Sequence, residues 1–281
     1  MSLNESAMIE INKSMALLEI SGPDSERLLQ GQLTCDVARL DDQHWIPGAC
    51  CTAKGRMVAN FVIARQGTRF LLRLPTAQAE ALRQHLSRYA VFYKVSLSAS
   101  SWQVRGLLES SDLEAGQICW QENSARLQWP DGRTELWGET VEGITLETEA
   151  WQLADIAAGV VWVETASRES WIPQHIHWDI LGGVNFRKGC YTGQEVVARV
   201  QYLGKSKRQL ATIQLAEACH VDVLTPVMLG EKTIGEVASW CGNQGLVVLS
   251  QEPESGNVTL LGQTATLGNC SLAALDQPRS H

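Results

Sequence analysis

The spacing of apolar residues over the first hundred positions predicts strands and helices that follow one another along the chain. Residues 15–20, MALLEI, have the character of a strand, and the stretch 21–33 predicts a helix that ends near Gly31. A second helix is expected to open at Pro75 and to keep an apolar stripe as far as Tyr89. Other apolar runs, separated by turn residues, predict strands at 44–51, 55–65, 68–75 and 91–97.

The second half of the chain is punctuated by glycine and turn residues. Residues 102–138 predict several short strands, and 148–159 predict a helix that Gly159 ends. The run VVWVE, residues 160–164, predicts a further strand, and an irregular stretch follows it. From about Gly204 onward, short strand-like runs between glycines indicate a separate small antiparallel barrel.

These elements favour one fold class. Helices lie between antiparallel strands in two places, 15–40 and 45–98, which is typical of an α+β fold with ferredoxin-like units. A doubly wound parallel sheet is disfavoured for the same reason. We find no internal repeat.

Composition changes this picture only at a few points. The 281 residues carry a formal net charge of −8, which argues against binding nucleic acid through bulk electrostatics. The chain has no apolar run as long as the roughly 18–20 residues of a membrane helix and no signal-peptide pattern, so we expect a cytoplasmic protein without a membrane partner. Its eight cysteines form no CxxC pair, and in a reducing compartment we expect most of them to be free buried thiols.

Chemistry is concentrated in RKGCYTGQE, residues 187–195. Thr192 and Glu195 have the spacing of a capping box, so a helix is expected to begin there. Cys190 then lies two residues before a helix amino end and close to Arg187 and Lys188, and both neighbourhoods stabilise a thiolate. The sequence leaves two interpretations open, a reactive thiolate and a buried structural cysteine, because it does not show whether the sulfur is exposed.

The same motif carries a family resemblance. KGCYTGQE followed by VVAR resembles the signature of the YgfZ-type folate-binding proteins, bacterial factors of tRNA modification and iron–sulfur maintenance that are related to the aminomethyltransferase (T-protein) of the glycine cleavage system. Further matching segments occur in the expected order, and the resemblance covers most of the chain from about residue 15. Those segments are 28–37, 51–63, 88–97 and 172–210.

The resemblance implies an architecture. We expect two interleaved ferredoxin-like subdomains and a carboxyl-terminal antiparallel β-barrel, arranged as a three-lobed ring around a folate-binding channel. The folate-binding region would span 1–203, with one subdomain formed by about 1–43 together with 147–203 and the other by 44–146. The barrel would span 204–281.

The resemblance also implies a cofactor, tetrahydrofolate or a derivative. Trp151 matches a tryptophan of the family's folate site. Met15, or its neighbour Ser14, stands where the family has a second aromatic residue, and a thioether can still pack on a ring. Gln194 and Glu195 are candidates for hydrogen bonds to the pterin edge, and Arg199 for the glutamate tail. A half-buried structural role for Trp151 and a helix-capping role for Glu195 are the alternatives.

Two further groups of residues are weaker candidates. A dense basic run could face glutamate tails or tRNA phosphates, or could be a solvated turn between domains; its members are Lys188, Arg199, Lys205, Lys207 and Arg208. The spacing of His175, His177 and Asp179 resembles part of a metal site, but no second ligand cluster accompanies it, so we expect no metal.

The resemblance implies an accessory factor and not a classical enzyme. Cys190 would be its functional thiol, with Lys188 beside it, and its partners would be folate and iron–sulfur client enzymes such as a tRNA methylthiotransferase. Thiol exchange, transient ligation of a cluster and a covalent hold on a one-carbon unit all remain open as the role of the sulfur. The alternatives are a tetrahydrofolate-dependent aminomethyltransferase, which the thiol disfavours because T-proteins have an aspartate there, and a module that binds tRNA directly.

Overall fold

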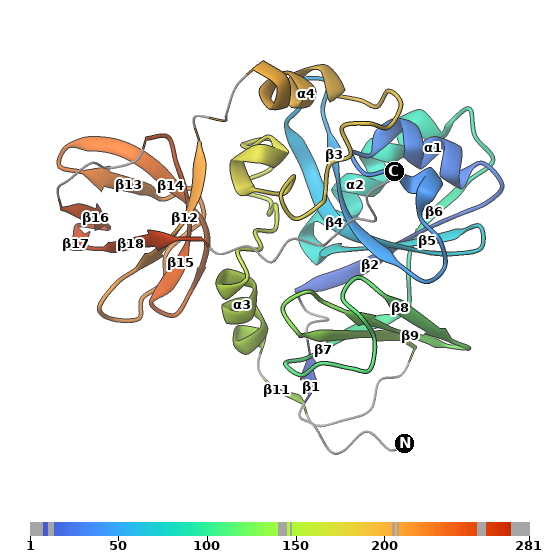
Figure 1. Cartoon of the computed structure of the whole chain (residues 1–281), viewed down its shortest axis with the longest axis horizontal. Coiled ribbons are helices and arrows are strands. Elements are labelled where there is room, and N and C mark those ends of the chain that lie inside the picture. Colours follow the sequence, from blue (N-terminus) through green and yellow to red (C-terminus); the bar gives the residue numbers. More distant parts are fainter. Residues whose placement is uncertain are drawn as a thin grey trace.

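Three β-sheets and four α-helices make up the described part of the chain. The computed structural model describes residues 8–10, 14–139, 145–146, 148–203, 206, 208–251 and 257–270. Figure 1 shows a barrel on one side, helix α3 (Thr148–Ala157) next to it, and the other two sheets together on the far side. The structure confirms the α+β class and the carboxyl-terminal barrel. No helix within the described ranges is both long and apolar enough to cross a bilayer.

The first sheet has five antiparallel strands in the order β3-β4-β5-β2-β6. They are β2 (Met15–Ser21), β3 (Trp45–Cys51), β4 (Met57–Gln66), β5 (Arg69–Pro75) and β6 (Ser96–Ala99). Helices α1 (Ser25–Gln32) and α2 (Thr76–Ala90) pack on one face, and a short 3₁₀ turn, η1 (Val37–Arg39), follows α1.

Strand periodicity divides the side chains of this sheet between two cores. On β2, Leu18 and Ile20 join the core under the helices, whereas Leu17 joins a larger core on the opposite face. On β5, Arg73 lies two residues after Leu71, so its side chain enters the larger core as well. A charged side chain buried in that position must be paired with an opposite charge or satisfied by hydrogen bonds.

The second sheet packs over that face. Its order is β11-β1-β7-β10-β9-β8, with β1 parallel to β11 and antiparallel to β7. The strands are β1 (Met8–Glu10), β7 (Gln103–Leu107), β8 (Ile118–Gln121), β9 (Ser124–Gln128), β10 (Thr134–Gly138) and β11 (Thr145–Leu146). Strand β2 shares its sheet with β3–β6, across the subdomain boundary expected near residue 44.

The third sheet is the barrel, a nearly closed antiparallel sheet of seven strands in the order β17-β16-β13-β14-β15-β12-β18. They are β12 (Gln209–Gln214), β13 (Pro226–Leu229), β14 (Lys232–Cys241), β15 (Gln244–Leu249), β16 (Val258–Leu260), β17 (Gln263–Thr264) and β18 (Thr266–Asn269). The expected start of the barrel, Gly204, lies outside the described residues. Apolar residues from the barrel, α3 and both other sheets share the larger core, which ties the three parts together.

One predicted strand is wrong, and another begins five residues later than expected. Residues 160–164 form no strand, although Val160–Val163 are buried. The buried side chain of Asn60 replaces a neighbouring strand there: its Nδ2 donates to Val161 O and its Oδ1 accepts from Val163 N, both at 2.8 Å. The strand expected at 91–97 begins only at Ser96, after turns that leave its first two residues exposed.

Candidate functional site

Cys190 lies at the surface. All eight cysteines fall within the described residues, and Cys190 is the exposed one; the other seven are buried or partly buried. It belongs to a loop that ends at helix α4 (Gln194–Leu203), close to the helix start predicted from Thr192 and Glu195. Exposure is the property that the sequence left undecided, and it is compatible with a reactive thiol and not with a buried structural one.

Lys188 ties this loop to the end of α1. Its Nζ donates to the backbone oxygens of Gln30, Leu33 and Cys35 at 2.8, 2.7 and 2.7 Å, and the residue is 8% exposed. Burial lowers the pKa of Lys188 from its ordinary value. The three ammonium hydrogens are therefore used on carbonyls of the core, so the expectation that Lys188 acts beside the thiol does not match its geometry.

The loop is also fixed on both sides of Cys190. Before it, Asn185 Oδ1 accepts hydrogen bonds from the backbone N–H groups of Arg187 and Lys188, at 2.8 and 2.9 Å. After it, Thr192 donates its N–H to Gly31 O at 3.2 Å. The Thr192 hydroxyl donates to Gln32 Oε1 at 3.1 Å, so this side chain anchors the loop to α1 instead of serving the expected capping box.

Gly193 allows the loop to pass close to the turn after β3. Its φ is +87°, a conformation that favours glycine, and a Cβ there would lie 2.4 Å from Thr52 O and 3.2 Å from the Cβ of Cys51. The loop therefore packs against the carboxyl end of β3 and holds Cys190 in a defined place.

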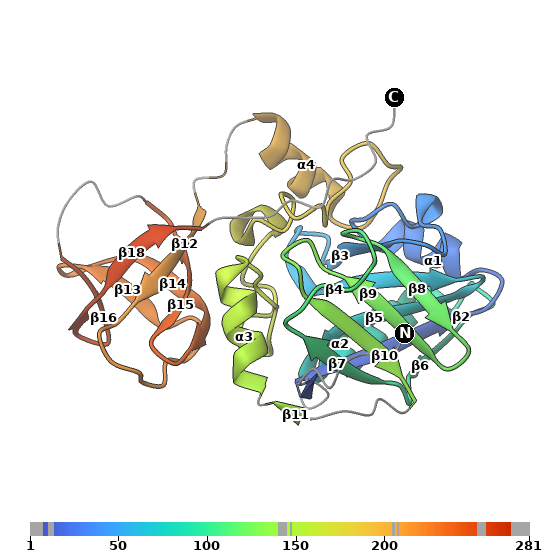
Figure 2. The same cartoon turned by 60° about the horizontal axis from the view of Figure 1, so that its bottom comes forward.

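The other candidates divide into two groups. Gln194 is partly buried, and Glu195 and Arg199 are exposed on α4; the ion pairs of the described residues include none between these two. Trp151 and Met15 lie instead in the larger core, 2% and 8% exposed. Figures 1 and 2 both show α4 apart from α3, so the structure does not bring the two groups together.

Trp151 is tightly packed in the core. A Cβ added at Gly106 would lie 2.3 Å from the indole, and the guanidinium carbon of Arg133 is 4.3 Å from the ring centroid. The indole Nε1 has no hydrogen-bond partner within the described ranges. Trp151 is thus a buried residue packed against an arginine. This is close to the half-buried structural role that the sequence left open as the alternative to folate binding.

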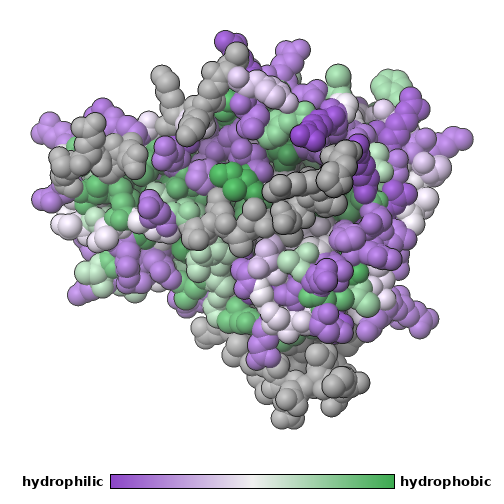
Figure 3. Space-filling model, in the orientation of Figure 1, coloured by the Kyte–Doolittle hydropathy of each residue, from purple (hydrophilic) through white to green (hydrophobic). Residues whose placement is uncertain are grey.

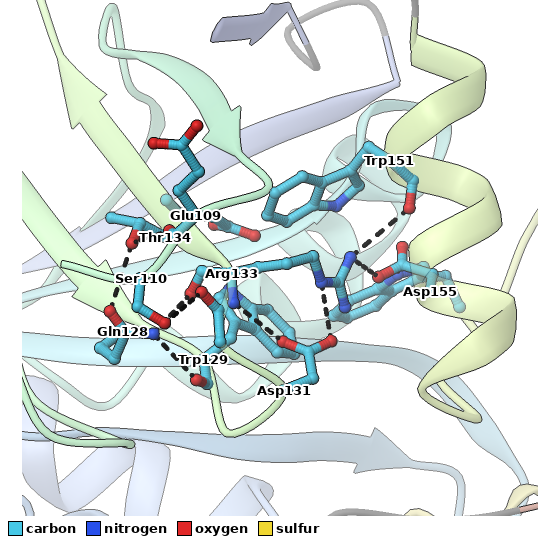
Figure 4. A network of polar contacts seen from close by, with 12 residues as sticks. Glu109, Ser110, Gln128, Trp129, Asp131, Arg133, Thr134, Trp151 and Asp155 are labelled. Atoms are coloured by element: carbon cyan, nitrogen blue, oxygen red, sulfur yellow. Dashed lines mark hydrogen bonds and ion pairs between the residues drawn. The ribbon is translucent and has the colours of Figure 1, made fainter. Parts of the chain in front are cut away.

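Arg133 connects Trp151 to a buried charge network (Figure 4). Its Nε lies 2.7 Å from Asp131 Oδ2, and its Nη1 lies 2.7 Å from Asp155 Oδ1. Asp155 Oδ2 also accepts a hydrogen bond from Trp162 Nε1 at 2.9 Å. One cation therefore holds two carboxylates that come from a turn and from α3.

A second buried ion pair lies in the same core. Arg73 Nη2 is 2.8 Å from Glu135 Oε1, at an angle that falls short of a hydrogen bond, and neither residue is exposed. The guanidinium carbon of Arg73 lies 4.5 Å from the ring centroid of Trp162. Burial raises the pKa of Glu135 and lowers that of Arg73. Both effects come from removing a charge from water.

A cavity opens beside this network. Its volume is about 20 Å³, which is roughly the room of one water molecule. Its lining is aromatic and apolar except for one carboxylate: Trp45, Pro47, Trp129, Pro130, Asp131, Ala158, Val160, Trp178 and Leu181. Trp45 and Trp129 have ring centroids 4.9 Å apart. Sequence reasoning missed these residues, and neither Trp151 nor Cys190 belongs to the lining.

His175, His177 and Asp179 do not share a strand face. They lie on and after a 3₁₀ turn, η2 (Pro173–Ile176), and His177 has a left-handed φ of +55°. Its Nε2 accepts a hydrogen bond from Leu210 N at 3.3 Å. Among the described residues no group of three His, Cys, Asp or Glu side chains is arranged for a metal ion.

Three residues of the basic run follow α4, and the structure describes one of them, Arg208. Its Nη1 donates to Glu236 Oε1 at 2.9 Å, so this charge is paired. Lys205 and Lys207 lie outside the described residues.

Comparison with known proteins identifies relatives of this chain. No family model matches the chain. A protein of Colwellia psychrerythraea described as the tRNA-modifying protein YgfZ is 30% identical over 260 residues, which cover 82% of this chain and 78% of that protein. The protein of the same description from Klebsiella pneumoniae is 34% identical over 224 residues, 70% of this chain and 68% of that one.

The fold has a solved counterpart. The crystal structure of the glycine cleavage system aminomethyltransferase T from Bartonella henselae aligns with a TM-score of 0.70 at 16% identity, and the alignment covers 97% of this chain and 87% of that one. At this identity the match shows the fold, and it confirms the expected aminomethyltransferase-like architecture. The sequence matches show that the chain belongs to the YgfZ family of tRNA-modifying proteins.

Proposed function

We propose that the chain is a folate-binding accessory factor that supports tRNA methylthiolation by maintaining the iron–sulfur enzyme that performs it, with Cys190 as its functional thiol. The observation that carries this proposal is the position of Cys190, exposed at the surface on a loop that is fixed on both sides. A thiol in that place can meet a client protein without any rearrangement of the loop.

The chemistry of an exposed thiol suits such a role. A thiolate is a soft ligand for iron and is also the nucleophile of thiol exchange. Of the nearby cations, Lys188 is occupied by backbone carbonyls, whereas Arg187 is exposed. Thiol exchange, ligation of a cluster and a covalent hold on a one-carbon unit remain open as the role of the sulfur.

The aminomethyltransferase-like fold supports the folate part of the proposal. The three tryptophans and one carboxylate of the aromatic cavity suit a flat ring that carries N–H groups, but the cavity volume is about 20 Å³, so the indoles would have to move apart to admit one. The Nε1 of Trp129 is buried and has no hydrogen-bond partner among the described residues, which leaves a donor for a ligand. Tetrahydrofolate would supply one-carbon chemistry when bound; the residues of this chain would hold and orient it.

The test uses a bacterial strain that lacks its own member of this family. Expression of the chain should restore the methylthio modification of tRNA, measured by mass spectrometry of digested tRNA. Cys190→Ala should abolish the restoration, whereas Cys119→Ala, which removes a partly buried thiol from β8, should not. Both variants should keep the wild-type affinity for folinic acid in calorimetry.

Two outcomes would overturn the proposal. Full restoration by Cys190→Ala would make the thiol dispensable. Turnover of an aminomethylated lipoyl carrier to methylene-tetrahydrofolate by the purified protein would make it an aminomethyltransferase instead.

A further inference from the structure

Helix α4 (Gln194–Leu203) has one face bound to the protein and one face in solvent. Val197 is buried, and its backbone oxygen accepts a hydrogen bond from Gln174 Nε2 at 2.7 Å. The residues on the opposite side span an arc of about 120°, at about 100° per residue. They are exposed, and they form what we call the α4 face: Glu195, Val196, Arg199 and Tyr202. This face begins directly after the loop that carries Cys190.

The α4 face is partly apolar, and its apolar side chains are held in place. Val196 and Tyr202 are among the large apolar side chains that are exposed in the described part of the chain. The Tyr202 ring packs edge-on against Phe186, with centroids 6.4 Å apart. A Cβ added at Gly55 would lie 2.9 Å from the Cβ of Val196. Figure 3 shows hydrophobic and hydrophilic residues side by side along the top of the molecule, where Figure 1 places α4. Apolar groups that are already ordered lose little side-chain entropy when a partner covers them.

The charges on and beside this face are mostly positive. Arg199 lies on the α4 face, Arg187 belongs to the loop that carries the thiol, and Lys54 belongs to the turn after β3. All three are exposed, as is Glu195, the acid of the α4 face. None of these four side chains takes part in an ion pair within the described ranges. Three cations and one carboxylate give this surface a local charge of +2, opposite in sign to the formal −8 of the whole chain.

A neighbouring acid does not cancel this charge. Asp36 follows the end of α1, within electrostatic reach of Lys188, and its carboxylate lies 3.5 Å from Arg39 Nε. It also accepts a hydrogen bond from Gln30 Nε2 at 2.9 Å. Arg39 thus balances the charge of Asp36, and the cations around the α4 face keep their positive field.

We propose that the α4 face, with Arg187 and Lys54, is a docking surface for an acidic segment of a protein partner. The inference rests on the proposed function, because it describes how a client protein reaches Cys190. Carboxylates of the partner meet the unpaired cations, and its apolar side chains cover Val196 and Tyr202. The surface also gives specificity, since the rest of this acidic chain repels an acidic partner that approaches elsewhere.

A nucleic acid is the less suitable occupant. A single strand carries one phosphate per nucleotide, so binding it requires a groove of cations along its path. Glu195 shares the α4 face with Arg199, and the net charge of −8 repels an extended polyanion. A protein segment that combines a few carboxylates with apolar side chains fits this mixture better.

The experiment measures how the charge of a partner changes the reaction of Cys190. The probes are two synthetic peptides, DDLCLDD and KKLCLKK, each with its cysteine held in a disulfide with 2-nitro-5-thiobenzoate. The Cys190 thiolate attacks the peptide sulfur, a Cys190–peptide disulfide forms, and thionitrobenzoate leaves as a coloured thiolate. The thiol proton goes to water. The rate in Cys190→Ala is subtracted to remove the reaction of the other seven cysteines.

The wild type should react about tenfold faster with the acidic peptide than with the basic one at an ionic strength of about 20 mM. The net charge of the whole chain predicts the opposite order, so this result identifies the local surface. The ratio of the two rates should fall toward one at about 0.5 M salt. It does not depend on the fraction of Cys190 that is ionised, which is the same for both peptides.

Variants assign the preference to named cations. Arg187→Ser combined with Arg199→Ser should bring the ratio to one or below. The matched control, Arg88→Ser combined with Lys232→Ser, removes two other exposed cations, one from α2 and one from β14, and should keep the wild-type ratio. The comparison of peptides in the wild type decides the question even if a variant fails to fold.

Two results overturn the inference. The first is a wild-type ratio of one or below at low salt. The second is protection of Cys190 by RNA. If oligouridylate slows the reaction with a neutral peptide, SSLCLSS, at least about tenfold while the acidic peptide reacts no faster than the neutral one, the surface is one for nucleic acid.

The proposed function stands or fails separately. If Cys190→Ala restores the methylthio modification while the acidic peptide is preferred, the proposed function fails and the docking surface stands. If Cys190 is needed for that restoration but the two peptides react alike, the proposed function stands and the docking surface is wrong.

Discussion

Replacement of Lys188 by methionine tests whether the thiol loop is held by a buried cation. Methionine has nearly the same length but no donor, so the oxygens of Gln30, Leu33 and Cys35 lose three contacts of 2.7–2.8 Å. A buried acceptor left unpaired costs about 1–3 kcal/mol. We take the lower end for each oxygen, because the lowered pKa of Lys188 indicates that burial of its charge already opposes these bonds. The total is about 3 kcal/mol of local stability.

Hydrogen exchange measures that quantity directly. The free energy for opening the loop sets the protection of its amides, and about 1.4 kcal/mol corresponds to a factor of ten. Peptides that cover residues 186–193 should therefore exchange about 100-fold faster in Lys188→Met than in the wild type. Amides of β4 should keep their protection, since that strand lies within its own sheet and core.

The control is Lys232→Met, which removes an exposed lysine whose Nζ donates to Gln251 Oε1. It should leave exchange in 186–193 within twofold of the wild type. Protection of the loop in Lys188→Met within threefold of the wild type, in a protein with an unchanged melting temperature, would refute the argument that this ammonium holds the loop.

Two other predictions concern stability. Asn60→Ala should lower the free energy of unfolding by about 3–5 kcal/mol in urea denaturation, because it leaves a buried N–H and a buried carbonyl of 160–163 without partners; a loss under 1 kcal/mol would contradict this role. Burial, assisted by two nearby arginines, lowers the pKa of His175 to about 4. Between pH 6.5 and 4 the unfolded chain therefore binds this proton while the folded chain does not. Stability should fall over that range by about 3 kcal/mol more in the wild type than in His175→Gln, whereas His220→Gln, at an exposed position, should follow the wild type.

The sequence predicted most elements because one face of each carries a regular apolar pattern. The error at 160–164 shows the limit of that method. The run is apolar and β-branched because it is buried, yet its hydrogen-bonding partner is the side chain of Asn60, about a hundred residues away in the chain. Nothing in the local pattern distinguishes such a segment from a strand.

The thiol loop and the aromatic cavity differ in how far the sequence could predict them. Cys190 could be found because its motif is local, and proximity in sequence also suggested Lys188 as its neighbour. That side chain turns toward carbonyls at the end of α1, because buried acceptors need a donor. Trp45, Trp129 and Trp178 come from three distant segments, so only the fold brings them together.

Strand β3 (Trp45–Cys51) connects the cavity with the thiol loop. Trp45 and Pro47 line the cavity toward one end, and Gly193 of the loop packs on Cys51 at the other, about 13–20 Å away at roughly 3.3 Å per residue. A ring bound beside Trp45 and Asp131 would therefore lie away from the sulfur of Cys190.

This separation bears on the three roles considered for the thiol. Thiol exchange and iron ligation need only the exposed sulfur and a client protein, whereas a covalent hold on a one-carbon unit needs the folate ring and the sulfur to meet. The distance along β3 favours the first two roles. A crystal structure with folinic acid should therefore place N5 of its ring more than 8 Å from the sulfur of Cys190. A distance within bonding reach would refute this reasoning and restore the third role.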